Sequence, residues 1–277
     1  MKKLVYFLLF TLSLSTYAQS PWTQKKGEAY LQLTFTTIPK YSELYGNPDY
    51  SSEREISDNT LQLYAEYGLS DKTTLIANLP LKLVASNDLV TATATPITTE
   101  ESLTSLGNVQ LGIKHNFLNK KWLVSGQLTV EANTGTFNAA SGLRTGYDAW
   151  TFTPIVSIGR GFNSWYIQAF TGVDIRTNEY SSAYKLGGEL GYKAADWLWV
   201  AGFLDGVASF QNGEAVIPVT NTLTGLYVNN QSYAAFGLKF IGEINKNFGA
   251  NLGLGGALGG RRVPKSPALS VGVYYKL

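Results

Sequence analysis

The chain of 277 residues contains no cysteine and a single histidine, His115. Without cysteine, neither disulfide bonds nor thiolate metal ligands can form. Hydrolases pair a nucleophile with a base that is usually a histidine, and no Gly-x-Ser-x-Gly motif is present to supply the nucleophile. The sequence therefore predicts no catalytic residue, no metal site and no cofactor, so an enzyme is not expected.

Neither sign of charge is in excess. The 22 Lys and Arg residues nearly cancel the 20 Asp and Glu residues, which leaves a net charge of +2. Because nucleic-acid binding needs a concentrated basic surface, no nucleic-acid partner is predicted. The mean hydropathy of -0.04 is too low for a helical membrane protein. It is compatible with a membrane barrel, in which lipid-facing and lumen-facing residues average out.

Long apolar runs are confined to the start of the chain. Lys2 and Lys3 precede a mostly apolar stretch over residues 4–14, which is too short to cross a bilayer as a helix. This pattern predicts a signal peptide over residues 1–18, with small residues before the cut. We expect the exported part, residues 19–277, to form one large β domain.

The final eleven residues show the clearest pattern that is present. Apolar or aromatic side chains occupy every second position, namely Leu269, Val271, Val273, Tyr275 and Leu277. Period two is the side-chain period of a β-strand, so one face of this strand is wholly apolar. A chain that ends on such a strand resembles a bacterial outer-membrane β-barrel, whose final strand is recognised by the barrel-assembly machinery. We therefore expect this machinery and membrane lipid as partners.

The same alternation recurs in about twelve stretches of roughly ten residues, the length of a tilted membrane strand. Short turns alternate with longer loops, of which residues 38–58, 85–105 and 208–230 are the longest predicted. An even strand number places both termini on the side of the short turns, the periplasmic side. The pattern predicts an all-β, antiparallel, up-and-down transmembrane barrel without a plug domain, in the bacterial outer membrane.

Aromatic residues near the short turns suit an interfacial girdle. These are Phe117, Trp122, Trp165, Trp197, Phe248 and Tyr275. By parity His115 also faces lipid near this rim, so it is expected to be an interfacial side chain. The phase of the strand near Trp197 is ambiguous, and we place Asp205 inward because a carboxylate in hydrocarbon is costly.

The polar positions of the alternating strands should face the lumen. The lumen-lining candidates are Tyr30, Gln62, Tyr64, Glu66, Lys82, Lys114, Gln127, Glu131, Tyr166, Asp174, Arg176, Glu189, Lys239 and Glu243. These charges either pair and pack the lumen shut or line a polar pore of low ion selectivity. Inward tyrosines such as Tyr64 and Tyr166 could stack an aromatic solute.

Several segments resemble a known family of outer-membrane proteins. They are residues 64–72 (YAEYGLSDK), 77–81 (ANLPL), 107–112 (GNVQLG) and 130–135 (VEANTG). They are similar to transporters of the meta-pathway of phenol degradation, which are distantly similar to fatty-acid-transporter barrels. The resemblance implies a barrel that passes small molecules, hydrophobic or aromatic ones included. Only residues 19–26 precede the first strand, so the N-terminal plug of fatty-acid transporters is absent and gating is left to loops or lumen.

We therefore expect a channel or transporter for passive uptake of small molecules. The first alternative is a non-conducting barrel with a structural or surface-binding role through its long loops. The second is an outer-membrane hydrolase, which the single histidine disfavours. The sequence does not name the solute.

Overall fold

The computed structural model describes residues 19–87 and 99–277. The predicted signal peptide lies outside these residues. No helix in the described part is long and apolar enough to cross a membrane. The described elements are β1 (Ala29–Tyr45), β2 (Tyr50–Ser70), β3 (Thr73–Ser86), β4 (Glu101–Leu106), β5 (Gln110–Asn119), β6 (Leu123–Glu131), β7 (Thr151–Gly161), β8 (Trp165–Arg176), β9 (Ala183–Ala195), β10 (Leu198–Ser209), α1 (Val219–Thr222), β11 (Ser232–Glu243), β12 (Phe248–Arg261), β13 (Val263–Pro264) and β14 (Ala268–Lys276).

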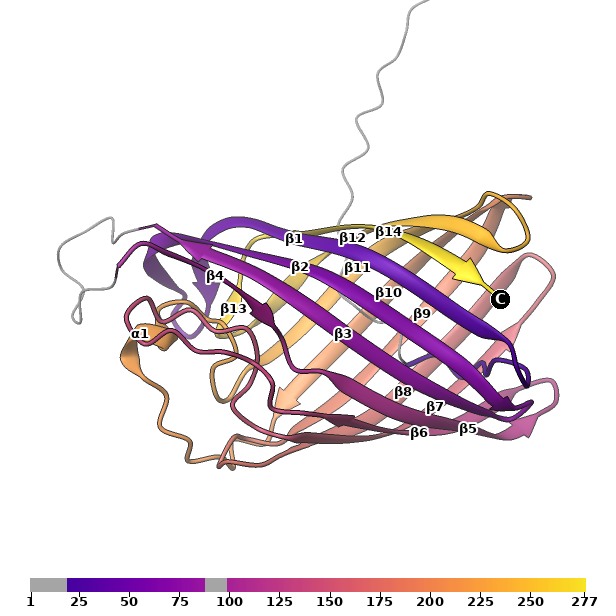
Figure 1. The fold of residues 1–277 in the computed structure, drawn as a ribbon, viewed down its shortest axis with the longest axis horizontal. Coiled ribbons are helices and arrows are strands. Elements are labelled where there is room, and N and C mark those ends of the chain that lie inside the picture. The colour runs from indigo at the N-terminus through magenta and orange to yellow at the C-terminus, as the bar shows by residue number, and fades with distance from the viewer. Residues whose placement is uncertain (1–18, 88–98) are drawn as a thin grey trace, which may run out of the picture.

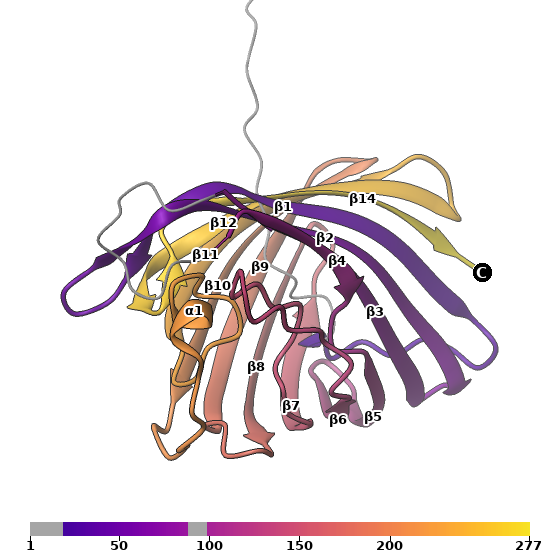
Figure 2. The ribbon, with the colours of Figure 1, turned by 60° about the vertical axis from the view of Figure 1, so that its left-hand side comes forward.

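Within the described residues, twelve strands close into an antiparallel barrel (Figure 1). Each strand pairs with its neighbour in the chain, β3 being followed by β5 and β12 by β14. The ring closes at β1, where Leu33 lies opposite Leu63 of β2 on one side and Val273 of β14 on the other. Figure 2 shows the strands tilted against the barrel axis. The predicted fold and the approximate strand number are confirmed.

The barrel carries its apolar side chains on the outside. On β1, Leu33 and Phe35 are 45% and 40% exposed, whereas Gln32 and Thr34 between them are 2% and 5% exposed. A water-soluble sandwich would show the reverse, because exposed apolar surface is costly in water. Lipid removes that cost, and closure leaves no unpaired strand edge in the hydrocarbon.

The short turns lie at the end that carries the carboxyl terminus, which is the periplasmic end. All six predicted girdle residues are exposed there, from 37% for Phe248 to 70% for Phe117. His115 is also exposed, and its ring lies 5.1 Å from that of Phe117. The phase predicted near Trp197 is correct, since Asp205 lines a lumen cavity and Leu204 is 61% exposed.

The structure corrects the loop predicted over residues 38–58. The strands β1 and β2 continue beyond the membrane as a hairpin, and the connection between them comprises only residues 46–49. Their register shifts between Ile38 and Tyr41, which interrupts the period-two pattern. Neither face of this extension meets lipid, so polar residues are tolerated on both faces and the sequence reads as a loop.

The loop predicted over residues 85–105 is also partly wrong. Residues 101–106 form β4, which pairs with the outer end of β3 from Leu81 to Ser86. The membrane-spanning partner of β3 is β5, which begins at Gln110. The side chains of β4 are alternately half-buried and exposed. The alternation of apolar and polar residues is therefore too weak to predict this strand from the sequence.

Candidate functional site

The inner face of the barrel is polar. Most of the predicted lumen residues line cavities, namely Gln62, Tyr64, Lys82, Gln127, Glu131, Tyr166, Asp174, Arg176, Glu189 and Lys239. The other candidates lie nearer the periplasmic turns and contact one another or the wall. Tyr30 packs between Tyr64 and Tyr274, Glu66 is paired with Lys114, and Glu243 is paired with Lys276.

Lumen charges are largely paired. Lys114 is fully buried, and its Nζ lies 3.0 Å from an oxygen of Glu66, which also accepts a hydrogen bond of 2.7 Å from the hydroxyl of Tyr64. Lys82 pairs with Asp58, and Lys239 pairs with Glu189. The removal of one partner from such a pair leaves an uncompensated buried charge. These pairs fill part of the lumen and rigidify its wall.

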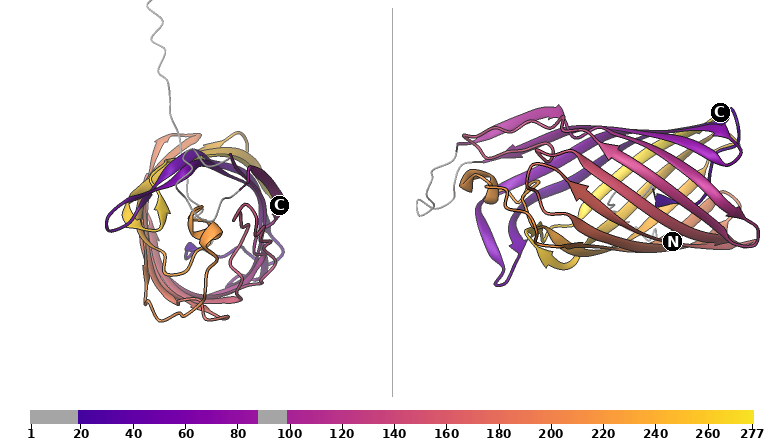
Figure 3. Two further views of the ribbon diagram at one scale, coloured as in Figure 1. Left: turned by 90° about the vertical axis from the view of Figure 1, so that its left-hand side faces the viewer. Right: turned by 90° about the horizontal axis from the view of Figure 1, so that it is seen from below.

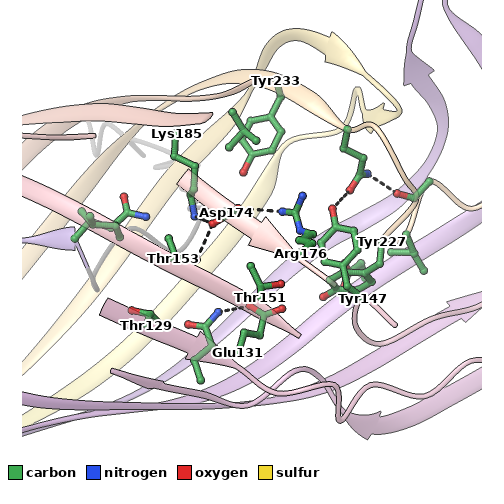
Figure 4. Close-up of a pocket in the computed structure, with 18 of the residues that line it drawn as sticks. Thr129, Glu131, Tyr147, Thr151, Thr153, Asp174, Arg176, Lys185, Tyr227 and Tyr233 are labelled. Carbon is green, nitrogen blue, oxygen red and sulfur yellow. Dashed lines mark hydrogen bonds and ion pairs between the residues drawn. The ribbon is translucent and has the colours of Figure 1, made fainter. Parts of the chain in front are cut away.

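A second charge cluster lies on β8 and β9 in the wide part of the lumen (Figure 4). The carboxylate of Asp174 lies 3.0 Å from Arg176 and 3.5 Å from Lys185, and it accepts a hydrogen bond of 2.8 Å from Thr153. Glu131 on β6 accepts hydrogen bonds from the side chain of Gln110 at 2.7 Å and from that of Asn108. Ionic side chains of both signs therefore line this part of the lumen.

The extracellular end is closed by an outer cap, defined as residues 136–147 and 218–228. These segments belong to the β6–β7 and β10–β11 loops, and the second contains α1, which lies within the ring of strands in Figure 3. The two loops touch closely, since a Cβ at Gly142 would lie 2.0 Å from the carbonyl oxygen of Thr220. Asn221 joins them by donating to the carbonyl oxygens of Gly142 and Leu226 at 3.2 and 2.9 Å.

The outer cap packs on the inner face of the extracellular hairpins. An apolar cluster holds it there, formed by Tyr41, Ile56, Val84, Leu143 and Leu226. The hydroxyl of Tyr41 donates a hydrogen bond of 2.7 Å to the carbonyl oxygen of Thr224. Arg54, which is fully buried, donates to the carbonyl oxygen of Ser141. The cap and the extracellular hairpins thus share a small packed core.

The periplasmic end is narrowed by an inner segment, defined as residues 19–26. It precedes β1 and runs inside the lumen, where the hydroxyl of Ser125 donates a hydrogen bond of 2.6 Å to the carbonyl oxygen of Pro21. The backbone N–H of Gln24 donates to Thr74, and its side chain donates to Glu66 at 2.6 Å. Its eight residues form no plug domain, yet they occupy the place where a gate would act, which the sequence did not predict.

Between the outer cap and the inner segment lies a central chamber. Its volume is about 400 Å³, and its lining includes Tyr227 of the cap and Gln19 of the inner segment. A second cavity of about 280 Å³ adjoins it and shares Gln19, Tyr227 and Glu131. A chamber of this size is within the range of small-molecule sites.

On the other side of the inner segment is a vestibule of about 370 Å³ that opens near the periplasmic turns. It is lined by Ser20 and Trp22 of the inner segment together with wall residues. A small cavity of about 10 Å³ shares Gln19 with the chamber and Glu189 with the vestibule. That volume holds about one water molecule. The inner segment therefore lies beside all three cavities.

Tyrosines mark the boundary of the chamber with the outer cap. The ring of Tyr147 lies 5.5 Å from that of Tyr180 and 5.3 Å from that of Tyr227. Burial raises the pKa of Tyr147 and of Tyr227, so both hydroxyls stay protonated at neutral pH. The Tyr147 hydroxyl donates a hydrogen bond of 2.6 Å to Gln231. The cap therefore presents neutral aromatic rings to the chamber.

The predicted solute tyrosines are already engaged through their hydroxyl groups. Tyr64 donates to Glu66, and Tyr166 donates to Glu189 at 2.7 Å. The ring of Tyr166 borders the vestibule and that of Tyr64 the cavity beside the chamber. Both rings are fixed in orientation, and their role toward a solute stays a prediction.

The comparisons with known proteins agree with this architecture. Residues 60–271 match the family described as "Putative MetA-pathway of phenol degradation". No curated protein sequence matches the chain. The COG4313 outer membrane channel from Pseudomonas putida F1 has a similar structure, with a TM-score of 0.70 and 17% identity over 96% of this chain and 100% of that one.

Two further solved structures share the fold at lower similarity. The translocator domain of the autotransporter NalP from Neisseria meningitidis has a TM-score of 0.54 and 11% identity, covering 91% of this chain and 89% of that one. The KdgM porin in complex with disordered oligogalacturonate has a TM-score of 0.53 and 8% identity, covering 89% and 98%. The fold is that of bacterial outer-membrane barrels.

Proposed function

The chain belongs to the family described as "Putative MetA-pathway of phenol degradation", and we propose that it is an outer-membrane channel for the passive uptake of small molecules, hydrophobic and aromatic ones included. The observation that carries the proposal is the row of cavities inside the barrel, a chamber of about 400 Å³ and a vestibule of about 370 Å³. Among the described residues, the outer cap and the inner segment border this row of cavities. Both lie outside the barrel strands, so they can move without breaking the pairing of those strands.

The two closures favour a gated rather than a freely open channel. In this proposal a solute first displaces the outer cap, enters the central chamber and then passes the inner segment beside Gln19. The paired charges of the chamber offer no excess of one sign. A small neutral solute therefore meets less resistance than an ion, which would have to be desolvated beside charges that are already satisfied.

The same closures favour one competing function. If neither the outer cap nor the inner segment moves, the barrel is a non-conducting wall element that presents its extracellular hairpins. We propose no enzymatic role, because the single histidine lies on the lipid-facing side, where Thr73 is its hydrogen-bond partner at 2.9 Å. As partners we propose membrane lipid and, through β14, the barrel-assembly machinery.

Single-channel conductance in planar bilayers tests the proposal. We expect the refolded protein to conduct weakly, a variant without residues 20–24 to conduct more, and liposomes with that variant to swell faster in neutral solutes. Heat-modifiable migration on gels shows that each variant has folded. The outer cap is loosened in the same way by Leu143→Ala. If the variant without residues 20–24, the Leu143→Ala variant and the protein with both changes all fold yet never conduct, the channel proposal is wrong and the non-conducting role holds.

A further inference from the structure

The vestibule is walled by aromatic rings from several segments. The central ring is that of Tyr166, whose centroid lies 5.8 Å from that of Trp22 at an interplanar angle of 81°. On its other side the ring of Trp199 lies at 5.6 Å, and Ile241 adds apolar surface. Edge-to-face and tilted arrangements at these distances are attractive for aromatic rings. The site is therefore shaped for planar apolar groups.

Two glycines let the rings of Tyr166 and Trp22 approach the wall closely. A Cβ at Gly191 would lie 2.1 Å from the ring of Tyr166, and one at Gly159 would lie 2.6 Å from Pro21 and 3.0 Å from the indole of Trp22. The bare backbone at these two positions accommodates the rings. As a result, the space between the rings remains open as the vestibule.

The charges that border the vestibule are neutralised within the wall. One oxygen of Glu189 accepts hydrogen bonds from Tyr166 at 2.7 Å and from Gln168 at 3.1 Å, and the other is paired with Lys239. A charged ligand would lose its hydration here without gaining an opposite charge to pair with, because the wall charges are already paired with each other. The lining therefore selects against ions and in favour of neutral molecules.

Trp22 differs from the other rings of the vestibule because it does not belong to the barrel wall. It is part of the inner segment, which hydrogen bonds at Pro21, Thr23 and Gln24 join to the wall. The vestibule thus already holds one aromatic ring supplied by a segment outside the barrel strands. A solute ring of similar shape can make the same contact with Tyr166 in place of the indole.

We propose that the vestibule is a binding site for a neutral aromatic molecule, and that this molecule competes with Trp22 for contact with the ring of Tyr166. Binding of the solute then favours the displaced form of the inner segment, because only that form leaves the contact vacant. A solute bound in the vestibule would thereby hold the inner segment aside for the molecules that follow it from the chamber. The inference rests on the proposed channel function and names a class of solute for it.

Spin labelling of the inner segment tests the competition directly. Because the chain has no cysteine, Ser20→Cys gives a single nitroxide site in the full barrel reconstituted in liposomes. We expect naphthalene to increase the mobility of this label and decalin, its saturated counterpart, to leave it unchanged. Equal responses to the two hydrocarbons, or no response to either, would overturn the proposal.

Trp199 and Trp197 provide a matched pair of variants. Trp199 lines the vestibule, whereas Trp197 is 59% exposed at the periplasmic rim. In the labelled protein, Trp199→Leu should raise the naphthalene concentration that gives half of the maximal response. The increase should be about threefold to tenfold, which corresponds to the affinity contributed by one ring contact. Trp197→Leu should not change it. If both variants, folded by gel shift, behave alike, the vestibule is not the site.

The outcome is independent of the channel proposal. Swelling of the same liposomes in neutral solutes reports passage without reference to the label. If solutes pass but the label does not respond to naphthalene, the aromatic site is refuted and the channel stands. If the label responds but no solute passes under any condition, the channel is refuted and the site stands.

Discussion

The two closures of the lumen are built in different ways. The outer cap is held by an apolar cluster that it shares with β1, β2 and β3, and Asn221, which bridges its two loops, is fully buried. The inner segment lacks such a cluster among the described residues, and hydrogen bonds such as those at Pro21 and Gln24 hold it, with Trp22 as its ring contact. Apolar packing is cooperative and hard to open in part, whereas a few hydrogen bonds can break locally.

This difference suggests a division of roles. The outer cap should open rarely and as a unit, because exposing its cluster to water costs free energy in proportion to the apolar area. The inner segment should open more often, because its hydrogen bonds can be exchanged for bonds to water at small net cost. The periplasmic closure is therefore the one that a bound solute can readily displace.

The largest expected effect concerns the anchor of the inner segment. Glu66 accepts from Gln24 and pairs with fully buried Lys114, so Glu66→Ala leaves that charge uncompensated. We expect the barrel to lose about 3–5 kcal/mol of unfolding free energy. The loss is measured by the heat-modifiable gel shift in denaturant.

The double variant Glu66→Leu with Lys114→Met separates the two roles of Glu66. It removes both charges, so most of the barrel stability should return, while the inner segment stays loose because Gln24 has lost its acceptor. Glu28→Gln is the control, because its pair with Lys25 is exposed and should contribute at most about 1 kcal/mol. A double variant that anchors the segment as firmly as the wild type would contradict the role of Glu66.

The next effect concerns the outer cap. Leu143 is fully buried in the apolar cluster, and Leu143→Ala should destabilise the closed cap by about 2–5 kcal/mol. Hydrogen exchange of residues 219–226 should accelerate at least about tenfold, with unchanged exchange in the barrel strands. Val219→Ala is the matched control, because Val219 is 55% exposed on α1. Similar acceleration in both variants would show that the cluster does not hold the cap.

The barrel could be predicted from the sequence because lipid imposes a strict period on it. Residues such as Leu33 and Phe35 meet hydrocarbon at every second position, so the strands and the inward phase of Asp205 follow from the pattern. The pairing of lumen charges also follows in outline, since each inward charge needs a partner. The identity of each partner requires the register, which the sequence alone does not supply.

The closures could not be predicted because they obey no period. The outer cap depends on contacts between distant residues, such as the hydrogen bond from Tyr41 to Thr224 and the burial of Arg54 against Ser141. The inner segment is a short polar stretch whose place is set by Gly159 and Ser125 on the opposite wall. One signal was available, since a lone tryptophan in such a stretch, Trp22, usually has apolar surface to cover.

The smallest expected effect concerns the extracellular hairpin. Asp49 lies 2.5 Å from Lys265, and this contact joins the β1–β2 turn to the loop before β14. The hydrogen bond from Lys265 lowers the pKa of Asp49, and the same bond raises the pKa of Lys265. The contact is therefore complete between pH about 4 and pH about 10, the ordinary pKa values of the two groups.

It should be lost as the pH falls through the lowered pKa of Asp49 or rises through the raised pKa of Lys265. Spin labels at Ser51→Cys and Ser266→Cys should report a broader distance distribution at both extremes, and salt should have the same effect because the pair is exposed. In Asp49→Asn the distribution should be broad at every pH. A sharp distribution that persists in this variant would show that the hairpin is held by its strand pairing alone.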